Sequence, residues 1–336
     1  MRQRVPVRRR GFARARLILA ATLVGTSALM TACGSGTQVP ENTSVAAVEP
    51  RPDLIEMTTP PQSETSGNCG DPELTLRPGP LPSPGAMPSG SPMAAIAANG
   101  KLRVGVDQNT YLFGFRNPTT GQLEGFDIDI AREIAKALFG DPDKIELRSV
   151  TAAERIPALQ NKQVDLIVRT FSATCERRRD VDFSGVYYRA TQRILVARNS
   201  GIRSGADLGG KRVCVTRGTT SPGPLFSLPK RPTVLGASNW TDCLAALQQG
   251  HVDAISADDP ILVGLVAQDR NLEMVGEVIG TGAYAVGIAQ GSPGLVRFVN
   301  GVLERIRADG TWQQIYNARL SALGPSPGPP DLRYKE

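Results

Sequence analysis

A single histidine, His251, occurs among the 336 residues, and none of the five cysteines forms a Cys-x-x-Cys pair. A Ser-His-Asp triad needs an imidazole beside a serine and a carboxylate, and zinc sites commonly use closely spaced cysteine or histidine ligands. The sequence therefore gives no support for a serine hydrolase or a zinc centre, and we expect neither a metal nor a cofactor.

Excess positive charge is also lacking outside the N-terminal leader. The whole chain has 38 basic and 32 acidic residues. Seven arginines lie in the first 32 residues, which contain no acid, so 31 basic residues remain against 32 acidic ones. Because binding to nucleic acid needs a concentration of lysine and arginine on the folded part, we expect no nucleic-acid partner.

The apolar run from Leu17 to Met30 is too short for a stable membrane span. Arginines precede it and Thr31-Ala32-Cys33-Gly34 follows it, which is the order of an export signal. The Ala-Cys-Gly junction resembles the lipobox of bacterial lipoproteins, so we expect residues 1–32 to be a signal peptide and Cys33 to carry a lipid. A plain secretory signal is the alternative, and the Sec and twin-arginine routes both stay open.

Two segments have little apolar periodicity and are rich in proline, serine and glycine: residues 33–92 and 323–336. Such compositions bury little apolar surface, and proline favours an extended spacer. We expect a tether before the globular part and a tail after it. About 230 residues remain between them, which is enough for two modest lobes.

Four cysteines follow Cys33, and an even number in an exported protein favours two disulfides. Three pairings are possible. Cys214 and Cys243 fall in the same part of the chain, and a loop of that size would stabilise the fold by about 3 to 4 kcal/mol in the entropic account. Elimination then leaves Cys69 with Cys175, which is a hypothesis.

An eleven-residue pattern occurs twice, as PALQNKQVDLI from Pro157 and as AALQQGHVDAI from Ala245. In each copy the Ala-Leu-Gln part predicts the end of a helix, and the Val-Asp-x-Ile part predicts a short buried strand. Polar residues follow both strands, at 169–172 and 256–259. Ligands of open α/β sheets bind at the carboxyl ends of strands, so these two segments are expected to form facing walls of a cleft.

Periodicity predicts further elements around the two copies. Strands are expected at 101–107, 164–168, 192–198, 211–217, 252–256 and 283–289. Helices are expected at 126–139, 239–249, 293–308 and 311–320, with others starting at Thr174 and Pro260. Thr151-Ala-Ala-Glu154 is a capping-box pattern for the helix that leads into the first copy.

Seven segments together resemble the polar amino-acid binding proteins of ABC importers, of the glutamine and glutamate type (solute-binding protein family 3). They are LRVGVD from Leu102, GFDIDIAREIAKAL from Gly125, IPALQNKQVDLIV from Ile156, TCERRRDVDFSGVYY from Thr174, KRVCVTRGTTS from Lys211, VDAISADDP from Val252 and IRADGTWQQIY from Ile306. The resemblance covers residues 95–322. The lipobox and the proline-rich tether are similar to those of actinobacterial lipoprotein members.

The resemblance implies a type II periplasmic-binding-protein-like α/β fold, in which two strands join two lobes with a ligand cleft between them. Lobe 1 would comprise residues 93–192 and 285–322, and lobe 2 residues 193–284. The implied function is a lipid-anchored, extracytoplasmic receptor that closes around a free L-amino acid and serves an ABC permease. It performs no chemistry.

The resemblance also implies roles for particular residues. Arg177 would clamp the α-carboxylate of the ligand, since a guanidinium offers two parallel donors and keeps its charge. Asp258 would pair with the ligand α-ammonium group, although a helix N-cap is its alternative role. Ser172 and Thr170 would contact the amino group, and the loop with Thr219 and Thr220 would meet the carboxylate.

Selectivity for the ligand side chain depends on three more positions. Asp107 matches an acidic residue that faces the side chain of the ligand in binders of glutamine or basic amino acids. Arg169 and Arg217 are basic departures from the family pattern and could supply the counter-charge for a second carboxylate, because an uncompensated anion in a closed cleft is costly. We therefore expect an acidic or amide amino acid, with glutamate first.

Two alternatives to a transport receptor are open. The closed form could signal to a membrane sensor instead of a permease. An enzyme similar to cyclohexadienyl dehydratase is also conceivable on this fold, but Glu154 and Asp107 have no evident base partner in the sequence.

Overall fold

The computed structural model describes residues 52–59 and 69–335. The expected signal peptide and Cys33 lie outside these residues. Within the described ranges, no helix is both long and apolar enough to cross a bilayer. The same ranges contain no group of histidine, cysteine, aspartate or glutamate side chains that could hold a metal ion.

A nine-stranded mixed sheet runs through the protein in the order β1-β10-β9-β11-β8-β12-β7-β2-β6. Its strands are β1 (Ile55–Glu56), β2 (Leu102–Val106), β6 (Ile145–Ser149), β7 (Leu166–Ile167), β8 (Val181–Ala197), β9 (Arg212–Thr216), β10 (Thr233–Ala237), β11 (Ala254–Asp258) and β12 (Leu272–Ala289). A small second sheet contains β3 (Asn109–Thr110), β4 (Gly114–Arg116) and β5 (Leu123–Glu124).

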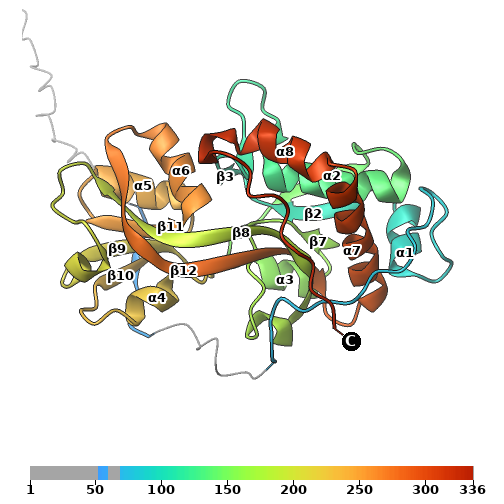
Figure 1. The fold of residues 1–336 in the computed structure, drawn as a ribbon, viewed down its shortest axis with the longest axis horizontal. Coiled ribbons are helices and arrows are strands. Elements are labelled where there is room, and N and C mark those ends of the chain that lie inside the picture. Colours follow the sequence, from blue (N-terminus) through green and yellow to red (C-terminus); the bar gives the residue numbers. More distant parts are fainter. Residues whose placement is uncertain (1–51, 60–68, 336) are drawn as a thin grey trace, which may run out of the picture. The chain divides into compact units, whose positions relative to one another are not determined.

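The α-helices are α1 (Pro92–Ala98), α2 (Phe126–Phe139), α3 (Arg155–Gln160), α4 (Pro222–Phe226), α5 (Trp240–Gln248), α6 (Asp259–Gln268), α7 (Pro293–Ala308) and α8 (Thr311–Arg319). Figure 1 shows α4, α5 and α6 around β9, β10 and β11, and α1, α2, α7 and α8 around β2 and β7. The sheet therefore carries two separate groups of helices.

Two strands connect these groups. The antiparallel strands β8 and β12 pair along most of their length and pass from one group of helices to the other (Figure 1). The apolar core of the first lobe includes Ala190 of β8 and Tyr284 of β12, whereas Ile194 and Ile279 belong to the core of the second lobe. This is the two-lobed α/β architecture with a two-strand hinge that the sequence implies.

Each copy of the eleven-residue pattern forms a helix followed by a strand: α3 and β7 in the first, α5 and β11 in the second. The shared aspartate has the same role in both. Asp165 accepts hydrogen bonds from the backbone N–H and the guanidinium of Arg103 at the start of β2. Asp253 does the same for Arg212 at the start of β9. The aspartate thus fixes the pairing of two parallel strands in each lobe.

The predicted helices at 126–139 and 293–308 have the bounds expected. Other elements differ in length. β8 and β12 are 17 and 18 residues long, much longer than the strands predicted at 192–198 and 283–289, because each strand crosses between the lobes and pairs with the other. At Thr174 the helix begins later than expected, as a short 3₁₀ turn at Arg177–Arg179.

Both segments expected to be unpacked make defined contacts where they are described. Thr75 is buried and bridges Tyr334 of the tail. Asn300 of α7 donates to the Thr75 hydroxyl and to the Leu76 carbonyl. The structure differs from the composition-based expectation here because a few apolar and hydroxyl side chains suffice when a folded surface is already present to receive them.

Both expected disulfides are present. Cys214 of β9 is bonded to Cys243 of α5 inside the second lobe. Cys69 is bonded to Cys175, which joins the segment before the globular part to the loop that precedes Arg177.

Candidate functional site: a cleft lined by opposite charges

A small cavity lies where the segments after β7 and β11 meet, with a residual volume of about 10 Å³, or room for about one water molecule. Six of the nine predicted ligand-binding residues line it: Thr170, Ser172, Arg177, Thr219, Thr220 and Asp258. Arg155, Ser221, Trp240 and Ile261 complete the wall. The two copies of the pattern therefore deliver their polar ends to one place, as the sequence predicts.

Arg177 enters this cavity from the first lobe. Its guanidinium donates to the carbonyl oxygens of Ser172, at 2.8 Å, and Gly218, at 3.1 Å. It also lies over the ring of Phe171, 4.9 Å from the centroid. The Thr174 hydroxyl accepts from the backbone N–H of Arg177 and starts the 3₁₀ turn. These contacts hold a permanently charged fork at the boundary between the lobes.

Asp258 enters from the second lobe, at the end of β11. It occupies the N-cap position of α6, but its carboxylate makes no capping hydrogen bond and accepts instead from the hydroxyl of Tyr284. Burial raises the pKa of Asp258 to about 6, while the Tyr284 hydrogen bond and the charge of Arg177 lower it. The Asp258 side chain therefore lines the cavity without capping α6.

Arg155 is a cation of the site that the sequence reasoning missed. It is 2% exposed, and its guanidinium donates to four backbone carbonyls, those of Ala152, Arg169, Thr170 and Gly218. Burial lowers the pKa of Arg155, and the charges of Arg177 and Arg169 lower it further. All four of these acceptors are neutral, so these hydrogen bonds leave the positive charge of Arg155 uncompensated.

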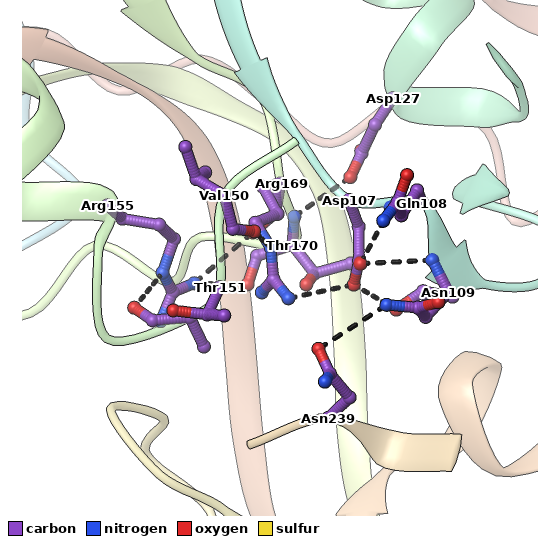
Figure 2. Close-up of polar contacts among 12 residues, drawn as sticks. Asp107, Gln108, Asn109, Asp127, Val150, Thr151, Arg155, Arg169, Thr170 and Asn239 are labelled. Carbon is purple, nitrogen blue, oxygen red and sulfur yellow. Dashed lines mark hydrogen bonds and ion pairs between the residues drawn. The ribbon is translucent and has the colours of Figure 1, made fainter. Parts of the chain in front are cut away.

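Asp127 holds Thr170, a residue of the first-lobe wall, through its backbone N–H. It is fully buried and accepts from the Thr170 backbone N–H and the Tyr187 hydroxyl, both within 2.8 Å. Burial raises the pKa of Asp127 to about 6. Thr170 has φ of 39°, a conformation that is uncommon for a residue with a side chain. The Asp127 contact, drawn in Figure 2, holds the backbone in that conformation.

Asp107 and Arg169 pair with each other instead of lining the cavity. Their side chains are 4% and 1% exposed, and Arg169 Nη2 lies 2.9 Å from Asp107 Oδ2 (Figure 2). Asp107 also accepts from the Thr110 hydroxyl, and Arg169 donates to the Val150 carbonyl. Since the two charges compensate each other, neither is placed to act as a separate counter-charge for a ligand side chain.

Arg217 does not line the cavity. Its guanidinium donates to the Ser238 hydroxyl and lies 3.6 Å from the carboxylate of Asp53. None of the three positions considered for side-chain selectivity, Asp107, Arg169 and Arg217, is among the residues that line the cavity in the part of the chain that the structure describes. The basic side chains that do line the cavity are Arg155 and Arg177.

The chain matches known proteins over its globular part. The family model of the bacterial extracellular solute-binding proteins, family 3, matches residues 102–320. The ABC transporter glutamine-binding protein GlnH of Bacillus subtilis is 38% identical over 225 residues, which is 67% of this chain and 82% of that protein. The glutamate-binding protein GluB of Corynebacterium glutamicum is 29% identical, over 69% of this chain and 82% of that protein.

Solved structures agree with these matches. The solute receptor for L-cysteine of Neisseria gonorrhoeae superposes with a TM-score of 0.66 at 28% sequence identity, over 70% of this chain and 97% of that one. An ancestral arginine-binding protein bound to glutamine superposes with a TM-score of 0.61 at 33% identity, over 66% of this chain and 98% of that one. These relatives are binding proteins, and none of them is described as an enzyme.

Proposed function

The chain belongs to the bacterial extracellular solute-binding proteins of family 3, and we propose that it binds a free polar amino acid and delivers it to an ABC importer. One observation carries the proposal: Arg155 and Arg177 of one lobe and Asp258 of the other line a single cavity. An α-amino acid carries its carboxylate and its ammonium group on the same carbon, and these side chains complement both.

Closure of the two lobes is the proposed mechanism. Arg177 and Arg155 both donate to the carbonyl of Gly218, a residue of the second lobe, so the lobes already touch at the site. A ligand stabilises the closed form only as far as it binds that form better than the open one. Contacts from both lobes to the same amino acid provide this difference, with β8 and β12 as the hinge.

The proposed ligand is glutamate or a close relative, namely glutamine, aspartate or asparagine. The buried pair of Asp107 and Arg169 is neutral as a unit, whereas Arg155 and Arg177 lie together with Asp258 as the anion of the cavity wall. A second carboxylate on the ligand would compensate the extra cation. The names of the relatives, which include glutamine-binding and glutamate-binding proteins, support the same class.

We also propose that the protein is extracytoplasmic and is attached to the cell membrane by a lipid on Cys33. Its support is the leader sequence and the two disulfides, which form in oxidising compartments. Metabolic labelling with a fatty acid, compared between the full-length protein and its Cys33→Ala variant, tests the anchor.

The proposed lobe boundaries follow the hinge. Lobe 1 would comprise residues 93–192 and 285–322, and lobe 2 residues 193–284.

Isothermal titration calorimetry with each of the twenty amino acids tests the ligand. We expect heat of binding with glutamate and its three relatives, at dissociation constants near the micromolar range, which corresponds to about 8 kcal/mol. Binding of lysine or arginine with no response to glutamate would overturn the ligand class. Absence of binding to all twenty would overturn the function.

A further inference from the structure

Tyr284, on the hinge strand β12, is held in place by the core of the first lobe. Its ring is fully buried and packs against Phe113, with ring centroids 5.8 Å apart, and against Tyr188, with centroids 5.7 Å apart. All three rings belong to the apolar core of that lobe. Because a close-packed core leaves a ring few alternative positions, the phenol has a fixed direction.

The backbone around Tyr284 holds one wall of the ligand cavity. Tyr284 forms an antiparallel bridge with Ser172, which lines the cavity from the first lobe. Beside this bridge, the Ala285 backbone N–H donates to the Phe171 carbonyl, at 3.0 Å. The position of Ser172 is therefore tied to that of β12.

The side chain of Tyr284 reaches the opposite wall. Its hydroxyl donates to Oδ2 of Asp258, on the second lobe, with 2.5 Å between the two oxygens. This separation is within the range of a hydrogen bond from a neutral hydroxyl to an ionised carboxylate. A carboxylate has two oxygens and about four acceptor positions, so Asp258 can accept from a ligand ammonium group at the same time.

Gly282 leaves the space in which these groups meet. A methyl group on its Cα would lie 3.0 Å from Oδ2 of Asp258, and 3.3 Å from both the Ser172 hydroxyl oxygen and the Tyr284 ring. A side chain at this position would therefore crowd all three groups. The carboxylate, the serine hydroxyl and the phenol thus converge on one point of β12.

We propose that Tyr284 is a positioning residue for amino-acid binding: its hydroxyl holds the Asp258 carboxylate in place, in the ionised form that pairs with the ligand ammonium group. This role rests on the proposed function, because Tyr284 acts through Asp258, one of the residues that line the cavity. A hydrogen bond donated to a carboxylate stabilises the ionised form over the protonated form. Tyr284 should therefore extend amino-acid binding to lower pH.

Titratable or charged groups face Asp258 from several elements. They are Tyr284 of β12, Tyr188 of β8, Asp259 of α6, Arg177 of the 3₁₀ turn and Arg155 of α3. Burial raises the pKa of Asp258 to about 6, and the Tyr284 hydrogen bond opposes burial more strongly than the charge of either arginine does. Loss of the Tyr284 hydroxyl should therefore raise the pKa of Asp258 further.

The test is Tyr284→Phe, which removes the hydroxyl and keeps a ring in the core. Calorimetry measures the dissociation constant for glutamate between pH 5 and pH 8.5, in the variant and in the unaltered protein. The midpoint of the affinity profile should move up by about one pH unit, which is the effect of losing a hydrogen bond to a charged group. The variant should bind nearly as well as the unaltered protein at pH 8.5 and about tenfold more weakly at pH 5.

Tyr188→Phe is the matched control. It removes a hydroxyl from the ring that stacks on Tyr284 and leaves the hydrogen bond from Tyr284 to Asp258 in place. Its midpoint should stay at that of the unaltered protein. Tyr284→3-fluorotyrosine tests the opposite direction, because the fluorine makes the phenol a stronger donor and should move the midpoint to lower pH. This variant also provides the test if circular dichroism shows that Tyr284→Phe does not fold.

The pH profile separates positioning of the carboxylate from packing. A loss of affinity that is equal at every pH would overturn the proposed role of Tyr284, because lost packing alone produces it. An unchanged or lowered midpoint in Tyr284→Phe, or an equal shift in Tyr188→Phe, would overturn it as well. Failure of the unaltered protein to bind any amino acid would instead overturn the proposed function.

Discussion

The two copies of the eleven-residue pattern build the same local structure but use their neighbouring positions differently. Two residues before the pattern, the first copy has Arg155 and the second has Cys243. Both side chains are buried. Arg155 extends its charge to the cavity wall, while Cys243 forms a disulfide with Cys214 on the adjacent strand.

The positions that follow the pattern differ in the same way. Three residues after its end, Thr170 of the first copy and Asp258 of the second both line the cavity. The first copy surrounds Thr170 with arginines, and the second supplies the carboxylate. One helix-strand unit, used twice, thus places positive charge on one wall and negative charge on the other, because the scaffold fixes the position and leaves the side chain open to change.

Removing Arg177 from the first-lobe wall is the strongest test of the separation of positive and negative charge between the two walls. We expect Arg177→Ala to weaken amino-acid binding by about thirtyfold to several thousandfold, because truncating one partner of a buried charge pair costs about 2 to 5 kcal/mol. Calorimetry checks the affinity and thermal unfolding checks the fold. Arg179→Ala, on the exposed side of the same 3₁₀ turn, is the matched control. Retained affinity in the Arg177 variant would remove the carboxylate clamp.

The disulfide of the second copy is expected to contribute stability and not affinity. The double variant Cys214→Ala and Cys243→Ala should lower the free energy of unfolding by about 3 to 4 kcal/mol, from the loop of 29 residues that the bond closes. Urea denaturation followed by circular dichroism measures the change. A loss below about 1 kcal/mol would show that the second copy does not depend on this bond.

Arg155 is expected to decide between acidic and amide ligands. Arg155→Met removes the charge and keeps an unbranched apolar side chain, so binding of glutamate should fall about tenfold more than binding of glutamine, a difference of about 1.4 kcal/mol. Competition calorimetry gives the ratio of the two affinities, which a uniform loss of packing would leave unchanged. An equal loss for both ligands would contradict the selectivity role.

The pH dependence of binding tests the role of the Asp258 carboxylate on the second-lobe wall. Burial raises the pKa of Asp258 to about 6, so the carboxyl is mostly ionised at pH 7 and mostly protonated at pH 5. A protonated carboxyl cannot pair with the ligand ammonium group, so affinity should fall about tenfold between pH 7 and pH 5. Titrations across this range measure it. In Asp258→Asn the affinity should be low at every pH and should not change between pH 7 and pH 5. A pH dependence of affinity equal to that of the unaltered protein would assign the titration to another group.

Acid is expected to change the stability of the ligand-free fold in the direction opposite to its effect on ligand affinity. The raised pKa values of Asp127 and Asp258 mean that the folded ligand-free protein binds more protons than the unfolded chain between about pH 4 and pH 6. Their contribution to stability is therefore present at low pH and is lost as the pH rises through about 6. Ligand binding and fold stability should consequently respond to acid in opposite directions.

Much of the architecture followed from the sequence because it depends on local pattern. The helix at 126–139 has its apolar residues at helical spacing, and the two Val-Asp-x-Ile segments mark the strands that lead to the site. The length of β8 and β12 was missed, since only their mutual pairing extends them. Arg155 was missed because an arginine at a helix start is usually exposed. Its correspondence to the buried Cys243 was the available signal.

By itself, the sequence determined the duplicated unit and favoured two disulfides, since these follow from a short repeated pattern and from an even number of cysteines. The resemblance to a family supplied most residues of the cavity wall. Tertiary structure alone decided which charges compensate one another. Asp107 and Arg169 are 62 residues apart in the chain and meet as a buried ion pair, while Arg217 faces Asp53. The energy of a charge pair depends on a separation of a few ångströms and on burial, and neither quantity is encoded in local spacing.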